Sequence, residues 1–150
     1  MALTAGSEVF IDTNILVYAS FPATSFHHVR RSRLSELEND RVVFWTSRQV
    51  LREFLAVTTR PGSVIPPPSL NVLLHAVRQF EAEFEIADED SAVTVFLLDI
   101  LRSRTVMGKQ IHDANIVATM RRYGIPSLLT HNTADFHRHA SDIAILPLIP

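Results

Sequence analysis

Short apolar runs alternate with amphipathic segments along this chain, and the alternation limits the possible folds more than any other feature. The runs predict strands over residues 8–11, 42–45, 84–87, 127–130 and 143–146. Between the strands, apolar side chains recur three or four residues apart, which predicts helices. Strands that alternate with helices form a parallel sheet with helices on both faces. We therefore predict an α/β fold with a short, mostly parallel central sheet.

Local signals set the limits of several helices. Thr46 and Gln49 have the spacing of a capping box, which predicts a helix that runs to Thr58. Gly124 is the residue type that ends a helix, here one expected from about Asp113 onward. The remaining helices are predicted over residues 15–19, 27–38, 70–84 and 93–101.

The composition is that of one globular domain, residues 1–150. The chain has 47% hydrophobic residues and 20% charged residues, which excludes a disordered chain. It has no cysteine, which excludes a disulfide framework, a thiolate zinc site and a cysteine nucleophile. No apolar run reaches the length of a membrane span, and the N-terminus does not resemble a signal peptide. We expect a soluble, cytoplasmic domain with no membrane partner.

Three acidic residues stand beside the ends of predicted elements. Asp12 follows the first strand, Asp135 follows the strand at residues 127–130, and Asp113 opens a helix. Each one alone fits a helix cap or a turn. However, ligands of parallel sheets gather outside the carboxyl ends of the strands, where these acids are expected.

Glu53 is placed differently, at the edge of an apolar helix stripe that contains Val50 and Val57. An unpaired carboxylate is costly in such a position. Arg52 is a poor partner because adjacent helix residues do not face each other. A salt bridge to a distant arginine and a place in an acidic site are the two alternatives.

Four carboxylates at one end of a sheet would repel one another unless cations neutralise them. Oxygen ligands alone favour Mg²⁺ or Mn²⁺ over zinc. Two such ions, about 3.5–4 Å apart, support hydrolysis of phosphodiester bonds. They would also change the net charge from −2 to +2, which a polyanionic substrate requires.

The chain resembles the PIN-domain nucleases, and most of all the VapC-type toxins of bacterial toxin–antitoxin pairs. The resemblance rests on FIDTNIL at residues 10–16, on Glu53, on HDA at residues 112–114 and on LTHNTADF at residues 129–136. These motifs occur in the order and spacing of the family and extend over nearly the whole chain.

The resemblance implies that four acids carry catalysis and bind Mg²⁺ or Mn²⁺, namely Asp12, Glu53, Asp113 and Asp135. It implies supporting roles for Asn14, which would brace Asp12, and for Thr130 and Asn132, which would order water and the Asp135 loop. The implied activity is that of a metal-dependent endoribonuclease on structured RNA such as tRNA or rRNA. The implied partners are a cognate antitoxin and a second copy of the chain.

Other classes of protein fit the motifs less well. Haloacid-dehalogenase phosphatases and receiver domains need a second acid near Asp12 and a late lysine, but Asn14 stands in the first place and no lysine follows Lys109. A zinc hydrolase is disfavoured because H-E-x-x-H is absent, and His27, His28 and the histidines of residues 137–139 are expected at the surface. A catalytically inactive PIN-fold module that binds RNA or protein remains the main alternative.

Contact with RNA would also need cations outside the metal site. The candidates are Lys109, Arg121 and Arg122, together with Arg30, Arg31 and Arg33, and for each one taken separately a solvated helix face is the stronger interpretation.

Overall fold

A five-stranded sheet in the order β3-β2-β1-β4-β5 forms the centre of the molecule, in a computed structural model that describes residues 3–149. All four neighbouring pairs of strands are parallel, which confirms the predicted α/β class. The strands are β1 (Glu8–Ile11), β2 (Val43–Ser47), β3 (Glu85–Ala87), β4 (Ser127–Thr130) and β5 (Ala144–Pro147).

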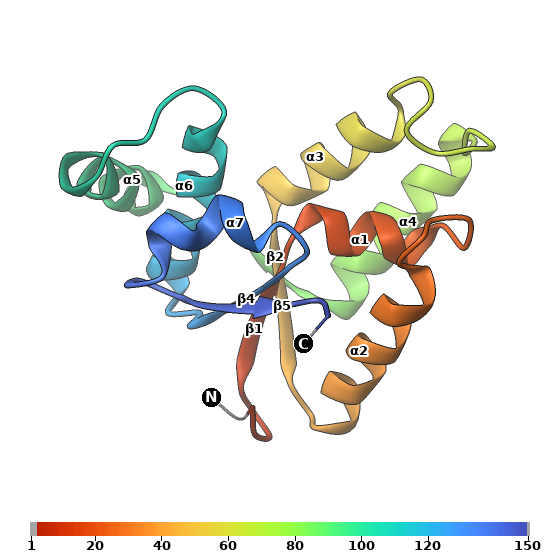
Figure 1. Ribbon diagram of the computed structural model, residues 1–150, viewed down its shortest axis with the longest axis horizontal. Helices are drawn as coiled ribbons and strands as arrows, with labels where there is room; N and C mark the ends of the chain where they lie inside the picture. The colour runs from red at the N-terminus through yellow and green to blue at the C-terminus, as the bar shows by residue number, and fades with distance from the viewer. Residues whose placement is uncertain (1–2, 150) are drawn as a thin grey trace.

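Helices cover both faces of this sheet. Figure 1 shows α1 to α4 on one side of it and α5 and α6 on the other, as predicted. The helices are α1 (Thr13–Ser20), α2 (His27–Asn39), α3 (Arg48–Thr58), α4 (Leu70–Glu83), α5 (Ser91–Ser103), α6 (Gln110–Tyr123) and α7 (Thr133–Phe136), followed by the short 3₁₀ helix η1 (His137–His139).

The inner strands are apolar because both of their faces are covered. Phe10 of β1 is paired with Trp45 of β2 and Leu128 of β4, and Phe10 and Leu128 are fully buried. Strands buried on two sides lack the alternation of apolar and polar residues that marks a half-exposed strand. The rigid β1–β4 pair therefore fixes the loops that follow Ile11 and Thr130.

The start of α3 differs from the prediction by one residue. Thr46 lies inside β2, where its hydroxyl donates to the carbonyl of Ile11 at 3.3 Å. Ser47 is the residue that caps the helix, and its hydroxyl accepts from the amide of Val50 at 3.3 Å. The predicted cap at Thr46 is wrong because this hydroxyl is used between strands.

Helix α6 runs from Gln110 to Tyr123, and Gly124, whose φ is +70°, forms the left-handed turn expected after it. Asp113 consequently lies within the first turn, not at the first position. A carboxylate there interacts favourably with the positive end of the helix dipole.

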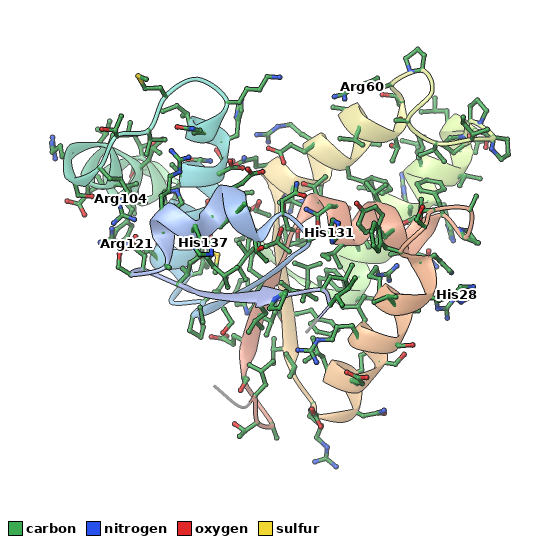
Figure 2. All side chains as sticks on the ribbon, in the orientation of Figure 1. His28, Arg60, Arg104, Arg121, His131 and His137 are labelled. Carbon is green, nitrogen blue, oxygen red and sulfur yellow. The ribbon has the colours of Figure 1, made fainter. Side chains whose placement is uncertain are left out.

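Two of the histidines expected at the surface are buried. His27 has 6% of its surface exposed, and its Nδ1 is 2.8 Å from the carbonyl oxygen of Tyr18. His139, the last residue of η1, is fully buried, and its Nδ1 lies 3.2 Å from the guanidinium of Arg104. His28 and His137 are exposed, as expected, and Figure 2 shows His28 at the edge of the molecule. Among the residues that the structure describes, no helix has the combination of length and hydropathy that a membrane crossing needs.

Candidate active site

The four predicted acids line one cleft at the carboxyl end of the sheet. Asp12 follows β1, Glu53 lies on α3, Asp113 on α6 and Asp135 on α7. The cleft has a volume of about 530 Å³. Figure 1 shows how these elements converge beyond the ends of β1, β2 and β4. Four segments far apart in the sequence thus contribute one carboxylate each.

Asp12 is the most buried of the four, with 6% of its surface exposed. Its carboxylate accepts from the amide of Thr13 at 2.7 Å, the hydroxyl of Thr130 at 2.7 Å and the side-chain amide of Asn14 at 3.0 Å. The first of these bonds also makes Asp12 the N-cap of α1. Burial raises the pKa of Asp12, the hydrogen bonds oppose this change, and the charge of Glu53 adds to it. Asp12 therefore caps a helix and lines the cleft with the same carboxylate.

Asn14 and Thr130 hold two loops together around Asp12. Besides its bond to Asp12, Asn14 accepts from the amide of His131 at 3.0 Å. The hydroxyl of Thr130 donates to Asp12 and accepts from the amide of Asn132 at 3.0 Å. This hydroxyl also accepts from the side-chain amide of Asn14 at 3.3 Å, so its donor and both lone pairs are used within the protein. These bonds fix the Asp12 carboxylate and the loop that leads to Asp135.

Glu53 is held by hydrogen bonds instead of a salt bridge. One carboxylate oxygen accepts from the hydroxyl of Thr13 at 2.9 Å, and the other accepts from the side-chain amide of Gln49 at 2.8 Å. Within residues 3–149, Glu53 forms no ion pair with an arginine or lysine. Of the two alternatives for Glu53, the salt bridge to a distant arginine is therefore wrong for the described residues.

Gln49 connects α3 to α6, and sequence reasoning assigned it only to a cap. Its side-chain amide nitrogen donates to Glu53 and also to the carbonyl of His112 at 2.9 Å. Its oxygen accepts from the side-chain amide of Asn115 at 2.7 Å. Gln49 is 5% exposed and uses both ends of its amide. It therefore fixes Glu53 relative to the helix turn that carries Asp113.

Asp113 experiences the combined charge of the cleft. Its pKa is raised to about 6, first because it is partly buried and then because of the negative charges of Asp12, Asp135 and Glu53. The neighbouring His112 lowers it by a smaller amount. Asp135 is exposed at the rim of the cleft. The arrangement concentrates negative charge that the protein itself does not neutralise.

The acids suit a hard divalent cation by their chemistry, although they do not already enclose one. Within residues 3–149, no three histidine, aspartate or glutamate side chains are grouped closely enough to hold a metal ion. Mg²⁺ keeps several of its waters and commonly takes only one or two protein carboxylates. An oxygen-only set with raised carboxyl pKa values fits such an ion, and Asp12 and Asp113 are the members whose charge it would relieve most.

Arg60 is a cation of the cleft that sequence reasoning missed. It lies beyond the C-terminal end of α3, lines the cleft and forms no ion pair within the described residues. Figure 2 shows it at the top of the molecule beside the loop that leads to α4. The helix pattern of residues 48–58 gave no reason to select a residue that follows the helix.

Three of the predicted RNA-contacting cations occupy the two ends of α6, whereas Arg30, which was also expected on a solvated helix face, is buried in α2. Lys109 is exposed at the N-terminal end, beside the cleft. Arg121 and Arg122 lie in the last turn, where they pair with Asp99 at 3.2 Å and Asp90 at 2.9 Å. Figure 2 shows Arg121 on the side of the molecule opposite Arg60. RNA contact by these three residues stays a prediction.

The chain belongs to the PIN-domain family, because the model of the PIN domain matches residues 9–142. Similar folds occur in the DNA-bound VapBC complex of Salmonella typhimurium, with a TM-score of 0.67, 19% identity and coverage of 95% of this chain and 98% of that one. They also occur in VapBC2 of Rickettsia felis, with a TM-score of 0.65, 18% identity and coverage of 93% of this chain and 98% of that one. VapC20 of Mycobacterium tuberculosis, a toxin that cleaves the sarcin–ricin loop, has a TM-score of 0.64 and 16% identity, with coverage of 91% of this chain and 96% of that one. No curated protein matches the chain significantly.

Proposed function

We propose that this PIN domain is a metal-dependent endoribonuclease and the toxin of a VapBC-type toxin–antitoxin pair. One observation carries the proposal: four carboxylates line a single cleft, and none of them has an ion-pair partner within residues 3–149. A binding module without catalysis would gain stability by losing this repulsion. The repulsion is useful only where a cation and a negatively charged substrate enter together.

Within this proposal, each acid has a distinct part in holding Mg²⁺ or Mn²⁺. Asp12 is held by three hydrogen bonds and Glu53 by two, so their oxygens are oriented before an ion arrives. Asp113 and Asp135 complete the set from the opposite wall. Such ions stabilise negative charge on a phosphate and lower the pKa of a water that attacks it.

RNA is the proposed substrate, with tRNA and rRNA as the first candidates. The support is indirect: the fold is shared with toxins that include one described as cleaving the sarcin–ricin loop. Several of the similar structures are complexes of toxin and antitoxin. An antitoxin partner, a homodimer and a cytoplasmic location belong to the same proposal.

The test is cleavage of total tRNA and rRNA with Mg²⁺ or Mn²⁺ and with EDTA, by the wild-type chain and by Asp113→Asn in parallel. We expect EDTA and the substitution each to lower the rate by more than about 100-fold. That loss exceeds the roughly 10–100-fold effect that is typical of losing a residue which only supports a metal ligand. Asp99→Asn is the matched control, since Asp99 is exposed and pairs with Arg121 far from the cleft. Cleavage that survives both treatments would refute the proposed chemistry, and RNA binding without cleavage under all conditions would support the inactive module.

A further inference from the structure

A second cavity adjoins the acidic cleft and differs from it in chemistry. It has a volume of about 360 Å³ and lies between the α1–α2 loop and the α3–α4 loop. Tyr18 and Ser63 line both cavities, so the two are adjacent. The lining of the second cavity contains no charged side chain: Tyr18, Ala23, Thr24, Ser25, Phe26, Gly62, Ser63, Val64 and Ile65.

Two aromatic rings, those of Tyr18 and Phe26, line this cavity, and His131 packs against Phe26 outside the lining. The ring centres of Tyr18 and Phe26 are 5.2 Å apart, and those of Phe26 and His131 are 4.3 Å apart. The hydroxyl of Tyr18 forms no hydrogen bond within the part of the chain that the structure describes. Ile65, at the rim, leaves 73% of its surface exposed. The cavity thus offers aromatic and aliphatic surface together with a free polar atom.

The walls are held in place without a ligand. The hydroxyl of Thr24 donates to the carbonyl of Phe21 at 2.8 Å, which closes the α1–α2 loop. The hydroxyl of Ser63 donates to the carbonyl of Arg60 at 2.8 Å, which closes the turn after α3. Val64 is buried and anchors the same loop to the core. A preformed cavity of this size is typical of sites for small ligands or parts of larger ones.

We propose that this cavity, named here the Tyr18 pocket, binds the base of an unpaired nucleotide next to the phosphate that enters the acidic cleft. The proposal rests on the proposed nuclease function and adds the kind of RNA that the site takes. An uncharged heteroaromatic ring with polar edges matches an uncharged aromatic pocket, whereas a phosphate matches Arg60 and the cation of the neighbouring cleft. Proteins that read unpaired RNA commonly stack its bases on aromatic side chains.

The pocket also explains why the base must be unpaired. It lies between two loops, so a base can enter only when it has left a helical stack. Because Tyr18 and Ser63 line both cavities, such a base would lie next to the cleft that the acids line. Loops, bulges and strand ends are therefore the favoured substrates, and the bases of a continuous duplex are excluded.

The experiment measures binding of two labelled probes that carry the same charge, a decamer of riboadenylate and its abasic counterpart. Asp113→Asn serves as the parent protein, with Mg²⁺ present, so that the RNA stays intact. We expect the base-bearing probe to bind about tenfold more tightly, since stacking a base on an aromatic side chain contributes on that scale. Adding Tyr18→Ala should bring the two affinities close together, and Tyr18→Phe should preserve most of the difference.

Two further variants keep the outcome decisive. Ser25→Leu fills the pocket from an exposed position and should have the same effect as Tyr18→Ala without removing a core contact. Tyr123→Ala removes a comparable aromatic ring at the far end of α6 and should leave the difference intact. N-acetyl-phenylalaninamide, which models an aromatic side chain of a protein partner, should compete poorly with adenosine monophosphate.

Equal binding of both probes by the parent would refute base binding by the Tyr18 pocket. If the wild type still cleaved RNA with metal, the nuclease proposal would stand. Preference for the phenylalanine derivative would assign the pocket to a protein partner. Absence of both RNA binding and metal-dependent cleavage would overturn the two proposals together.

Discussion

The acids of the cleft and the acids of the outer surface differ in their partners. On the outer surface, Asp99 and Asp90 pair with arginines of α6, and Asp88 pairs with Arg48 at 2.9 Å. In the cleft, Asp12 and Glu53 receive only uncharged hydrogen-bond donors. Exposed ion pairs add little stability, about 0–1 kcal/mol each. The contrast therefore concerns function more than stability. The chain supplies arginines to its outer acids, whereas Asp12 and Glu53 have no cationic partner within the described residues, as the proposed metal site requires.

The largest effect is expected from Glu53→Gln, which removes one charge from the cleft and keeps the shape. Cleavage should be lost. The amide oxygen can accept from Gln49, and the amide nitrogen can donate to the hydroxyl of Thr13, so both hydrogen bonds survive. In EDTA the melting temperature should rise, by about 3 °C for each kcal/mol of repulsion relieved in a chain of this length.

The same variant should respond less to Mg²⁺ or Mn²⁺, because a ligand of the ion is missing. Thermal melts of wild type and variant, with EDTA and then with excess metal, measure both effects. Glu81→Gln is the control, since Glu81 pairs with Arg48 on the outer surface. A lower melting temperature for Glu53→Gln in EDTA would mean that the charge of Glu53 is compensated and would erase the contrast.

A smaller effect is expected from Gln49→Met, which keeps the length of the side chain and removes its hydrogen bonds. Glu53 would lose one of its two donors and its link to α6. Loss of a residue that orients a metal ligand typically lowers activity or metal affinity about 10–100-fold. We expect the metal concentration for half-maximal cleavage to rise, an effect that a general loss of stability would not produce.

Gln79→Met makes the same replacement on the exposed face of α4 and should leave the metal requirement unchanged. If both variants shifted the metal dependence equally, Gln49 would have no special link to the acids.

Arg60 and Arg121 allow the same comparison between the cleft and the outer surface to be made for cations. Arg60 lines the cleft without an ion pair among the described residues, whereas Arg121 is paired with Asp99. A contact between a cation and a phosphate contributes about one unit to the slope of log affinity against log salt. Arg60→Gln should reduce that slope by about one for an RNA decamer, and Arg121→Gln by much less. The opposite order would place the RNA on the far end of α6, as the sequence alone allowed.

The smallest effect concerns the dependence of stability on pH without metal. The pKa of Asp113 is about 6 in the folded chain, against an ordinary value of 3.8. Between these values the folded chain holds a proton that the unfolded chain has released, so the stability of the wild type should fall as pH rises from 3.8 to about 6. Asp113→Asn should lack this decline.

Melting temperatures in EDTA across that range, taken for both proteins, measure the difference. The pKa of Asp12 is also raised and contributes a decline of the same sign to both proteins. Parallel curves would show that Asp113 does not experience the charge of the other acids.

The sequence predicted the sheet well because its signals are local. Strand β4 has the predicted limits, and β1 follows directly from four residues ahead of Asp12. It predicted the acids only through their order and through the resemblance, since each alone looked like a cap. Asp12 does cap α1, and it also lines the cleft.

The parts that escaped prediction depend on contacts between distant segments. Gln49 matters because α6 brings Asn115 and the carbonyl of His112 to it, 66 and 63 residues away. The cap predicted at Thr46 was wrong because its hydroxyl donates to the carbonyl of Ile11, 35 residues earlier. The role of Arg60 depends on where the chain turns after α3. No local pattern contains this information.

The strand order of the sheet has a consequence for how the protein is made. Strand β1 is made well before its neighbour β4, and the Thr130 hydroxyl that holds Asp12 lies 118 residues after Asp12. Until then one edge of β1 is open and Asp12 lacks Thr130, while Asp135 has not been synthesised. The acidic cleft is therefore assembled only after β4 and α7 have been made, and no nascent fragment that stops before β4 carries all four acids.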